Sequence, residues 1–525
     1  MIRTITIPLL PSEAANDTSV RKALANEAGV TPNRVTDYTI EKRSIDARGR
    51  QAKVILQTKV FIDERPELQA PFDPQLRNVT NAPHVVIVGA GPAGLFAALR
   101  LINLGVKPIV IERGKDVRRR RRDLAAMNKQ GIVNPDSNYC FGEGGAGTYS
   151  DGKLYTRSTK RGDVKRILKL FVYFGAEEHI LYEAHPHIGT NKLPHIITAI
   201  REQIEACGGE VRFNTKLADI NVNGGKVSSV TTSDGDTISC QSVILATGHS
   251  ARDIFRLLDS KGIDVEAKPF ALGVRIEHPQ ELIDKAQYKC DIRDPFLPPA
   301  SYSLVSQEQG RGVFSFCMCP GGIIAPAATA PGEIVVNGWS PSKRNNPYAN
   351  SGTVVAVGLK DFARYGYTGP LAAMNYQQMV EQKAFVAGGG ALVAPAQRMV
   401  DFINGKSSST LPDCSYLPGI ISASLYDVLP TEVSTALQQA IGTFGKKMRG
   451  YYTNEAVMVA TESRTSSAVR IPRDKTTLQH PQITGLYPCA EGAGYAGGIV
   501  SAAIDGERCA EAIAVAMRTN TSKHT

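Results

Sequence analysis

Three glycines at fixed spacing are the residues most informative about chemistry in this chain. Gly89, Gly91 and Gly94 form G-x-G-x-x-G within VVIVGAGPAGLFAALRLINLGVKPIVIERG, directly after an apolar run. This spacing permits a tight turn at Gly89, approach of a pyrophosphate to Gly91 and close helix packing at Gly94. The following helix, with Pro92 and Ala93 in its first turn, offers free N–H groups to the anion. The pattern predicts a dinucleotide-binding turn.

An acidic residue follows this turn at the expected distance. Glu112 lies at the end of the next apolar run, where a carboxylate can accept hydrogen bonds from ribose hydroxyls. The same carboxylate would repel a 2′-phosphate. Glu112 therefore favours FAD or NAD over NADP, although the neighbouring Arg113 weakens the argument against NADP.

Two further glycine-rich segments favour FAD over NAD. The segment SVILATGHS (242–250) ends an apolar run at Thr247 and Gly248 and resembles the second FAD signature of flavoproteins with two dinucleotide folds. The segment 485–513 resembles their C-terminal motif, in which an acid and a helix start face the cofactor. Its candidate residues are Glu491, Gly492, Gly498 and Ile499. A separate NAD(P) site is disfavoured because too few residues follow for a second strand and acid.

Four longer strings resemble one known family. They are FGEGGAGTYSDGKL (141–154), HPHIGTNKL (185–193), FCMCPGG (316–322) and ESRTSSAVRIPR (462–473). The whole chain resembles the uncharacterised bacterial FAD-dependent dehydrogenases, whose members carry a small N-terminal α/β plait. It is more distantly similar to geranylgeranyl-reductase-like flavoproteins. That resemblance implies cofactor contacts at Gly144 and Gly145 with Thr148 nearby, and adenine contacts from the backbone of Lys216 or Leu217.

Several side chains are candidates for chemistry beside the flavin. Lys153 and Glu143 flank the glycine pair and could stabilise a reduced flavin or relay a proton, or else form loop ion pairs. Cys317 and Cys319 form C-x-C, a spacing that disfavours an unstrained disulfide and hence a redox pair. We expect one thiol to pack and the other to line the pocket. No histidine or second cysteine pair completes a metal site.

Other charged residues carry a functional and a structural interpretation. Arg464 could orient a substrate carboxylate through its planar guanidinium, or it could pair internally with Glu462. His185 and His187 precede a Gly-Thr turn, where histidines are commonly structural. In the run 118–122, one or two arginines could reach cofactor phosphates, and we expect the others to be solvated on a charged helix.

These residues need an α/β framework to position them. The pattern predicts an N-terminal plait in 1–70, with strands at 2–10, 35–45 and 51–62 and a helix at 19–28. A proline-rich linker follows. The predicted FAD-binding domain is Rossmann-like and discontinuous, covering 84–265 and 451–518. Residues 266–450 contain many Pro and Gly, and we interpret them as a β-rich substrate domain with long loops.

Composition limits the class of protein. The 525 residues are 42% apolar and 21% charged, which is typical of soluble globular domains. Nine cysteines, an odd number, argue against a disulfide framework and for a reducing compartment, with the cytoplasm as default. No secretory signal or membrane span is expected. The net charge of +10 permits acidic partners without requiring them.

The sequence predicts a soluble FAD-dependent oxidoreductase that transfers a hydride between FAD and an organic substrate. Direct reduction by NAD(P)H as a transient electron donor, or a redox partner protein, stays open. The alternative is a nucleic-acid-linked FAD protein that uses the basic surface and the plait. RNA-binding plaits stack bases on aromatic residues of their central strands, whereas here Tyr38 and Phe61 are isolated, which argues against that alternative.

Overall fold

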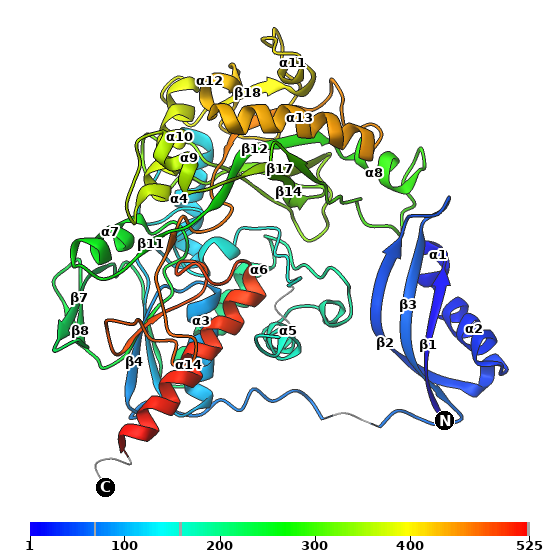
Figure 1. The fold of residues 1–525 in the computed structure, drawn as a ribbon. Coiled ribbons are helices and arrows are strands. Elements are labelled where there is room, and N and C mark those ends of the chain that lie inside the picture. The colour runs from blue at the N-terminus through cyan, green and yellow to red at the C-terminus, as the bar shows by residue number, and fades with distance from the viewer. Residues whose placement is uncertain (68–69, 157–159, 522–525) are drawn as a thin grey trace.

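A computed structural model describes residues 1–67, 70–156 and 160–521 (Figure 1). Its N-terminal part is a three-stranded antiparallel sheet in the order β1-β3-β2, with one face covered by helices. The elements are β1 (Ile2–Leu9), α1 (Pro11–Ala14), α2 (Asp17–Ala28), β2 (Val35–Asp46) and β3 (Lys53–Ile62). Ile5, Ile7 and Leu9 alternate along β1 and pack in one core with Val20 and Leu24 of α2. The predicted βαββ plait is confirmed.

The next sheet is parallel, in the order β22-β10-β4-β5-β6. Its strands are β4 (His84–Val88), β5 (Lys107–Ile111), β6 (Glu210–Arg212), β10 (Val243–Leu245) and β22 (Leu486–Pro488). Val85 and Ile87 of β4 pack in one core, and Val86 and Val88 pack in another. Burial on both faces explains why this strand is continuously apolar rather than alternating.

Helices cover the parallel sheet, and two of them pack unusually closely. They are α3 (Pro92–Asn103), α5 (Val164–Tyr173), α6 (Leu193–Ala206) and α14 (Ile499–Thr521). A β-carbon on Gly506 of α14 would lie 2.1 Å from the carbonyl oxygen of Ala93 in α3. The chain therefore closes its nucleotide-binding sheet with elements from near residue 500, as the sequence predicted.

A seven-stranded sheet forms the second half of the body, in the order β13-β14-β17-β12-β20-β18-β19. Its strands are β12 (Phe270–Pro279), β13 (Val305–Glu308), β14 (Arg311–Cys319), β17 (Tyr348–Val357), β18 (Ala394–Arg398), β19 (Ile420–Ser422) and β20 (Val457–Glu462). The predicted boundary at residue 450 separates β20 from this sheet, although β20 pairs with β12 and β18. That part of the prediction is wrong, because strand pairing across the chain is not visible in local patterns.

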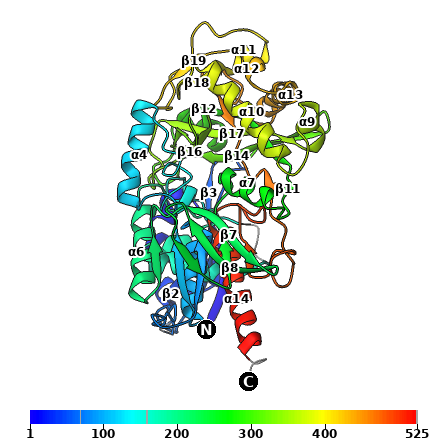
Figure 2. The same ribbon diagram turned by 90° about the vertical axis from the view of Figure 1, so that its left-hand side faces the viewer.

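The region interpreted as loop-rich also contains regular helices. They are α8 (Gln280–Tyr288), α9 (Leu359–Arg364), α10 (Ala372–Ala387), α11 (Met399–Ile403), α12 (Leu425–Val428) and α13 (Thr431–Lys447). In the view of Figure 2, the seven-stranded sheet lies above the parallel sheet. The two halves share a continuous apolar core, so the region between them is a packed interface.

Smaller elements complete the body. They are the sheet β7 (Leu217–Asn223), β8 (Lys226–Thr232) and β9 (Thr237–Ser239), the pairs β15 (Ile323–Pro326) with β16 (Val336–Trp339) and β11 (Glu266–Ala267) with β21 (Val469–Arg470), and the helices α4 (Val117–Gln130) and α7 (Arg252–Ser260). In the described part of the chain, no helix combines the length and apolar character that crossing a bilayer requires.

Candidate functional site

The carboxyl ends of three neighbouring strands bring the predicted nucleotide-binding segments together. β10 pairs in parallel with both β4 and β22, so the three segments that follow these strands meet at one edge. A β-carbon on Gly89 would lie 2.4 Å from the carbonyl oxygen of Ala246, and one on Gly492 would lie 2.7 Å from that of Gly248. Open parallel sheets bind ligands at this edge.

The glycines of the turn have different roles in the fold. Gly89 has φ +106°, which disfavours other residues, and a β-carbon on Gly94 would lie 1.9 Å from the carbonyl oxygen of Gly89. Gly91 precedes α3 with φ −78°, and the nearest atom to a β-carbon there is 3.9 Å away, the α-carbon of Gly145. The fold therefore needs glycine at positions 89 and 94, whereas at position 91 the protein leaves room for a β-carbon.

Glu112 links the turn to the neighbouring loop. Its side chain is 5% exposed, and its carboxylate accepts hydrogen bonds of 2.9 Å from the N–H groups of Ala90, Gly114 and Gly142. A carboxylate has about four acceptor positions, so a ribose hydroxyl could still be bound. Contact with a ribose stays a prediction.

The loop 142–148 lies directly against the glycine turn. The N–H of Gly144 donates to the carbonyl of Ala90 at 2.8 Å. A β-carbon on Gly145 would lie 3.1 Å from the α-carbon of Gly91, and one on Gly144 would lie 1.9 Å from the Thr148 hydroxyl oxygen. The structure thus brings the predicted glycine pair and Thr148 to the dinucleotide site.

A fully buried arginine holds this loop. Arg120 donates hydrogen bonds of 2.8–2.9 Å to the carbonyl oxygens of Asn138, Tyr139, Glu143 and Gly145. The other four arginines of the run 118–122 are exposed on α4. The expectation that one or two of the five arginines would reach a phosphate does not hold for Arg120, because the carbonyl oxygens of the loop already accept its N–H donors.

Replacing Arg120 with methionine should lower the free energy of unfolding by several kcal/mol, because four buried carbonyls lose their donor and each unsatisfied group costs about 1–3 kcal/mol before relaxation. Urea unfolding of the wild type and the variant measures this change in the free energy of unfolding. Arg122→Met, on the exposed face of the same helix, is the matched control and should stay within about 0.5 kcal/mol of wild type. Equal stability of the two variants would contradict the role of Arg120.

Glu143 is held at the start of α4. Its carboxylate accepts from the N–H of Val117 at 2.7 Å and from Arg201 at 2.8 Å. Burial raises the pKa of Glu143, while these two donors oppose the rise. The contacts describe an ion pair that caps a helix, and the alternative role in proton relay stays a prediction.

Arg113 and Leu217 lie beside the predicted adenosine end. Arg113 pairs with Asp253 at 2.6 Å, and its guanidinium lies 4.4 Å above the ring of Phe141. Leu217 is buried at the start of β7, and the N–H of Thr215 donates to the carbonyl of Glu112 at 2.9 Å. The segment before β7 therefore runs next to Glu112, as an adenine-contacting segment would.

A pocket lies where this loop meets the seven-stranded sheet. Its wall combines Ala146, Tyr149 and His249 from the nucleotide-binding half with Trp339, Glu462 and Arg464 from the other half. Its volume is about 30 Å³, enough for a water molecule, so a substrate must displace part of the wall. Both halves therefore contribute polar side chains to this pocket.

Glu462 and Arg464 do not pair with each other. Glu462 is 2% exposed and accepts from Arg275 at 2.8 Å. Burial raises the pKa of Glu462 to about 7, against the opposing charge of Arg275. Arg275 also donates to the carbonyl of Cys317 at 3.2 Å. A carboxyl that titrates near neutrality is suited to proton transfer.

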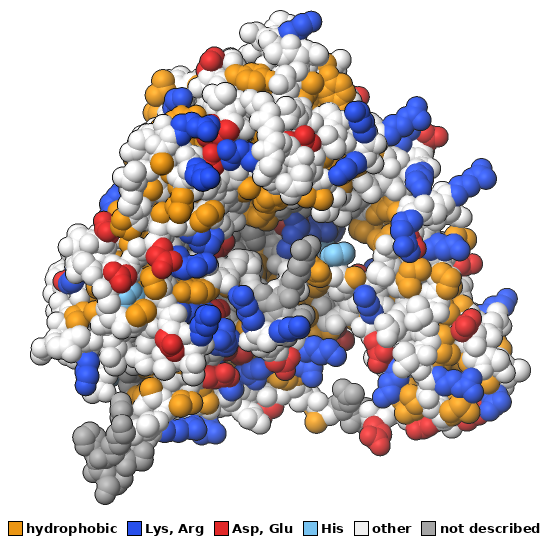
Figure 3. All heavy atoms as spheres, viewed as in Figure 1, with side chains coloured by type: hydrophobic (Ala, Val, Ile, Leu, Met, Phe, Trp, Pro, Cys, Tyr) orange, Lys and Arg blue, Asp and Glu red, His pale blue; other side chains and the backbone are white. Residues whose placement is uncertain are grey.

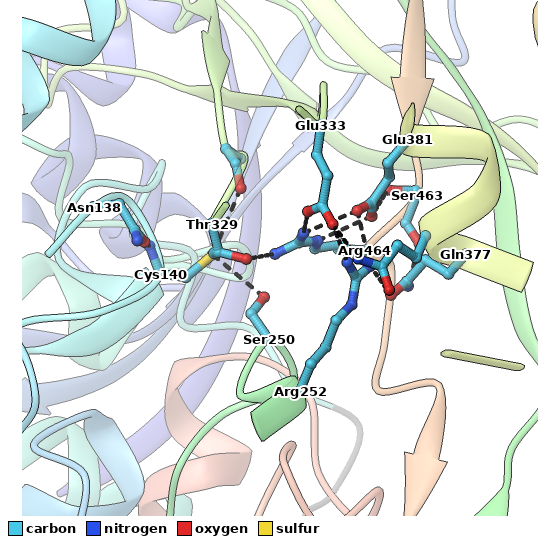
Figure 4. Close-up of polar contacts among 12 residues, drawn as sticks. Asn138, Cys140, Ser250, Arg252, Thr329, Glu333, Gln377, Glu381, Ser463 and Arg464 are labelled. Carbon is cyan, nitrogen blue, oxygen red and sulfur yellow. Dashed lines mark hydrogen bonds and ion pairs between the residues drawn. The ribbon is translucent and has the colours of Figure 1, made fainter. Parts of the chain in front are cut away.

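Arg464 belongs to a buried network of opposite charges (Figure 4). Its guanidinium donates to Glu381, to Glu333 at 3.1 Å and to Thr329 at 2.7 Å. Arg252, the first residue of α7, pairs at 2.8 Å with both Glu333 and Glu381. Four of the five Arg464 donors are used, so one N–H remains for a ligand in the pocket.

Two further polar groups face the same pocket. Burial, together with the charge of Arg464, lowers the pKa of His249 to about 4, so its ring is neutral near pH 7. The His249 ring is 2.7 Å from the hydroxyl of Ser250. The indole N–H of Trp339 is buried beside Tyr139 and makes no hydrogen bond of good geometry with it or with another described residue. An unsatisfied buried donor is uncommon and indicates a ligand or water position.

The remaining candidates lie to one side of this pocket. Lys153 donates to the carbonyl of Met318 and lies 3.7 Å from Asp151. Cys317 is exposed with φ +44° at an irregularity in β14, whereas Cys319 is buried, and both are free thiols. His187 bonds to the backbone of Ser342 at 3.2 Å. Catalytic roles for Lys153 and Cys317 stay predictions.

One buried cluster has donor types that could ligate a metal. Cys489, Asp505 and Cys509 place their ligand atoms within 4.8 Å of one another. However, Arg473 pairs with both oxygens of Asp505 at 2.7–2.8 Å and approaches Cys509 at 3.8 Å. The guanidinium already supplies the positive charge that such a cluster would need.

Comparison with known families and proteins agrees with this geometry. Three family models match in order along the chain: a domain of unknown function over 1–61, an FAD binding domain over 83–253, and the model "FAD-dependent protein, C-terminal domain-like" over 269–465. An uncharacterized protein of Clostridium beijerinckii is 40% identical over 513 residues, covering 94% of this chain and 95% of that protein. The chain belongs to this family of FAD-dependent proteins.

Two more distant matches are a monooxygenase and a halogenase. Para-nitrophenol 4-monooxygenase of a Pseudomonas species is 22% identical over 44% of this chain, and the match spans 55% of that enzyme. Among solved structures, halogenase PltM is 12% identical with a TM-score of 0.36, covering 84% of this chain and 71% of that one. At this level of similarity neither relative assigns a substrate to the FAD-dependent protein.

The residues at the strand ends fit FAD. The hydroxyl oxygen of Thr247 is buried without a hydrogen-bond partner among the described residues, at the edge where a cofactor's polar atoms would lie. Glu491 follows β22, and burial raises its pKa to about 7 against the charge of Lys268. Gly498, with φ +86°, precedes Ile499 at the start of α14, whose free N–H groups favour an anion.

Sequence reasoning missed several residues of the pocket. These residues are His249, which lies within the glycine-rich segment 242–250, and Trp339, Arg275 and Glu381. The single tryptophan of the chain was an available signal, because buried indole N–H groups usually need a partner. Arg275 and Glu381 gave no local signal, since their partners are far away in the sequence.

Proposed function

We propose that this FAD-dependent protein transfers a hydride between FAD and a small organic substrate held in the pocket beside Glu462. The observation that supports this most strongly is the shared wall, in which Ala146 and His249 of the nucleotide-binding half face Glu462 and Arg464 of the other half. Bound FAD supplies hydride chemistry at its isoalloxazine ring, so the protein must orient the substrate and handle a proton.

The proposed cofactor contacts follow from the four segments at the sheet edge. The glycine turn and the start of α3 would bind the pyrophosphate, and the acid after β5 would bind the ribose. The proposed contact residues are Gly89, Gly91, Pro92, Ala93, Gly94, Glu112, Arg113, Gly144, Gly145, Thr148, Leu217, Thr247, Gly248, Glu491, Gly492, Gly498 and Ile499.

Glu462 is the proposed proton donor and acceptor. In the reductive direction a conjugated substrate gains a hydride at one end of its π system, and the carboxyl of Glu462 gives its proton to the heteroatom X at the other end, which leaves the reduced substrate with an X–H bond and a carboxylate. In the oxidative direction the carboxylate takes that proton back. The spare N–H of Arg464 and the N–H of Trp339 can hold the oxygen or nitrogen of X, because both face the pocket.

Anaerobic reduction and reoxidation of the purified chain tests hydride transfer. The oxidised FAD-bound protein is mixed with NADH or NADPH, and dithionite-reduced protein is mixed with menadione as a two-electron acceptor. We expect the flavin absorbance band to return with menadione faster than it does for free reduced FAD. The hydride-transfer proposal is wrong if menadione reoxidises the reduced protein no faster than free reduced FAD, and if neither NADH nor NADPH bleaches the flavin band.

Replacing Glu462 with glutamine should slow reoxidation by menadione on the order of 10²-fold or more, the usual contribution of a positioned acid. Because the protonated carboxyl is the active form in this direction, the wild-type rate should fall as the pH rises through about 7. The E462Q profile should be low and flat.

Glu277 provides the matched control. It is also a buried glutamate of the seven-stranded sheet, burial raises its pKa to about 7, and it bonds to Ser415 away from the pocket. E277Q should keep the wild-type pH profile. If the inflection in the pH profile persists in E462Q, or disappears in E277Q, the titrating group is not Glu462.

A further inference from the structure

A large cavity separates the plait from the body, and it shares no lining residue with the pocket beside Glu462. Its volume is about 1820 Å³, larger than the roughly 300–1,000 Å³ of pockets for drug-sized ligands. One wall is the end of β2 with the turn after it, including Arg43 and Arg48, and the other comprises α8, the segment after it, and residues near 343 and 449. Figure 3 shows the hollow between the plait and the body, with Lys and Arg side chains around it.

The lining of this cavity is strongly positive. It contains nine lysine and arginine residues and two carboxylates, Glu183 and Asp291. Both carboxylates are already paired, Glu183 with Arg43 at 2.7 Å and Asp291 with Lys285 at 2.6 Å. Arg48, Arg293 and Arg344 are paired as well, with Asp46, Asp284 and Asp151 outside the lining, so four of the nine cations remain unbalanced among the described residues.

Four of these cations have no carboxylate partner in the described part of the chain. Lys343 and Arg449 are exposed and have neither an ion pair nor a side-chain hydrogen bond there. Lys289 and Lys447 are exposed and donate only to backbone carbonyls. Exposed cations that converge on one hollow raise the local concentration of anions.

Exposed rings lie among these charges. Phe296 is 51% exposed in the cavity wall. His185 lines the cavity and contacts the ring of Tyr155, with centroids 5.1 Å apart, and Tyr155 is 54% exposed. Cations that follow a phosphate backbone, together with aromatic surfaces on which bases stack, are the features by which proteins bind single strands without sequence preference.

We propose that this cavity binds single-stranded nucleic acid, with Lys289, Lys343, Lys447 and Arg449 contacting phosphates and Phe296 offering a stacking surface. The sequence argued against RNA on the faces of the plait's sheet, and one of those faces is covered by α2. The structure places the cations instead in the cleft beside the edge strand β2. Binding of a nucleic acid there does not need aromatic residues on the central strands of the plait.

The observations favour a nucleic acid over an acidic protein. A protein partner of this size would bury a continuous apolar core within its interface. The cavity wall instead has isolated exposed rings separated by lysine and arginine. The proposal does not depend on the redox reaction, because it concerns a different cavity and other residues.

The test is fluorescence anisotropy of a labelled 12-nucleotide single-stranded RNA of mixed sequence, titrated with the oxidised FAD-bound chain. Four phosphate contacts predict a slope of about −2.8 for log affinity against log salt, or about 50-fold weaker binding at 200 mM than at 50 mM salt. A single-stranded DNA of the same sequence should bind similarly, because phosphates and base faces are recognised.

The double variant K343E/R449E should weaken binding at least about tenfold at 50 mM salt and reduce the slope to about −1.4, because two contacts are lost. K360E/K383E is the matched control, with the same change of charge at exposed lysines outside the cavity, and should bind nearly as wild type. Menadione reoxidation in both variants confirms that the flavin site is intact.

Three outcomes would overturn the proposal. The first is absence of RNA binding at 50 mM salt. The second is equal weakening in both double variants, which would show attraction to overall charge. The third is tight binding of a labelled poly-glutamate peptide that RNA does not displace, which would assign the cavity to an acidic polypeptide.

Discussion

Replacing Gly91 with alanine is expected to reduce bound FAD from near one per chain to less than about a tenth, while the protein stays folded. The reason is that a β-carbon at this position has no protein atom within 3.9 Å, and φ is −78°, which alanine adopts freely. The added methyl group would instead occupy the space through which a pyrophosphate approaches the backbone. The ratio of flavin to protein absorbance after gel filtration measures the change.

Gly94→Ala is the informative comparison. Its β-carbon would lie 1.9 Å from the carbonyl oxygen of Gly89, so α3 itself must move. We expect this variant to lose both FAD and folded structure, whereas Gly91→Ala should unfold in urea like wild-type protein stripped of FAD. Wild-type FAD content in Gly91→Ala would show that the cofactor does not approach this turn.

Replacing Glu381 with glutamine is expected to lower the free energy of unfolding by about 3–5 kcal/mol. Glu381 is 0% exposed and accepts hydrogen bonds from Arg252, Arg464 and Ser463. Without the charge of Glu381, the buried guanidinium groups of Arg252 and Arg464 share Glu333 as their remaining carboxylate. Because Arg252 begins α7 and Glu381 lies on α10, the same change should loosen the contact between the two halves of the body.

The pH dependence of stability distinguishes this effect from simple loss of packing. Burial alone would raise the pKa of Glu381, but Arg252 and Arg464 outweigh it and lower the pKa to about 2. The stabilisation is therefore complete above about pH 4.5 and is lost as the pH falls toward 2. The difference in unfolding free energy between wild type and E381Q should shrink over that range.

A double-mutant cycle with R252M completes the test. The two substitutions should be less than additive, with a coupling of about 1–3 kcal/mol, because each removes a charge that the other would leave unpaired. E202Q, an exposed glutamate on α6, should change stability by less than about 0.5 kcal/mol. Strict additivity would show that Arg252 and Glu381 act independently.

The nucleotide-binding half was predictable because its signals are local. Strand, glycine turn, helix and Glu112 follow one another within about thirty residues, and the turn at Gly89 and Gly94 tolerates no other residue. The segment before Gly248 and the one containing Glu491 carry similar local patterns. Their meeting at one edge follows from parallel pairing of β4, β10 and β22.

The pocket could not be predicted in the same way, because its chemistry depends on partners far away in the chain. Arg120 belongs to a run of five arginines that is typical of a solvated helix, yet it alone is buried. Glu462 and Arg464 are close in sequence but pair with Arg275 and Glu381, respectively. β20 was separated from its sheet for the same reason, since pairing leaves no trace in a local window.

The close packing of Gly506 against Ala93 has a consequence for synthesis of the protein. The glycine turn leaves the ribosome long before β22 and α14, which complete the same domain. A nascent chain that ends before residue 486 therefore exposes one apolar side of α3 and lacks Glu491 and the start of α14. We therefore expect cofactor capture to wait until the segment 486–499 has been synthesised, and chains that stop before it to lack flavin and to stay open to chaperones and proteases.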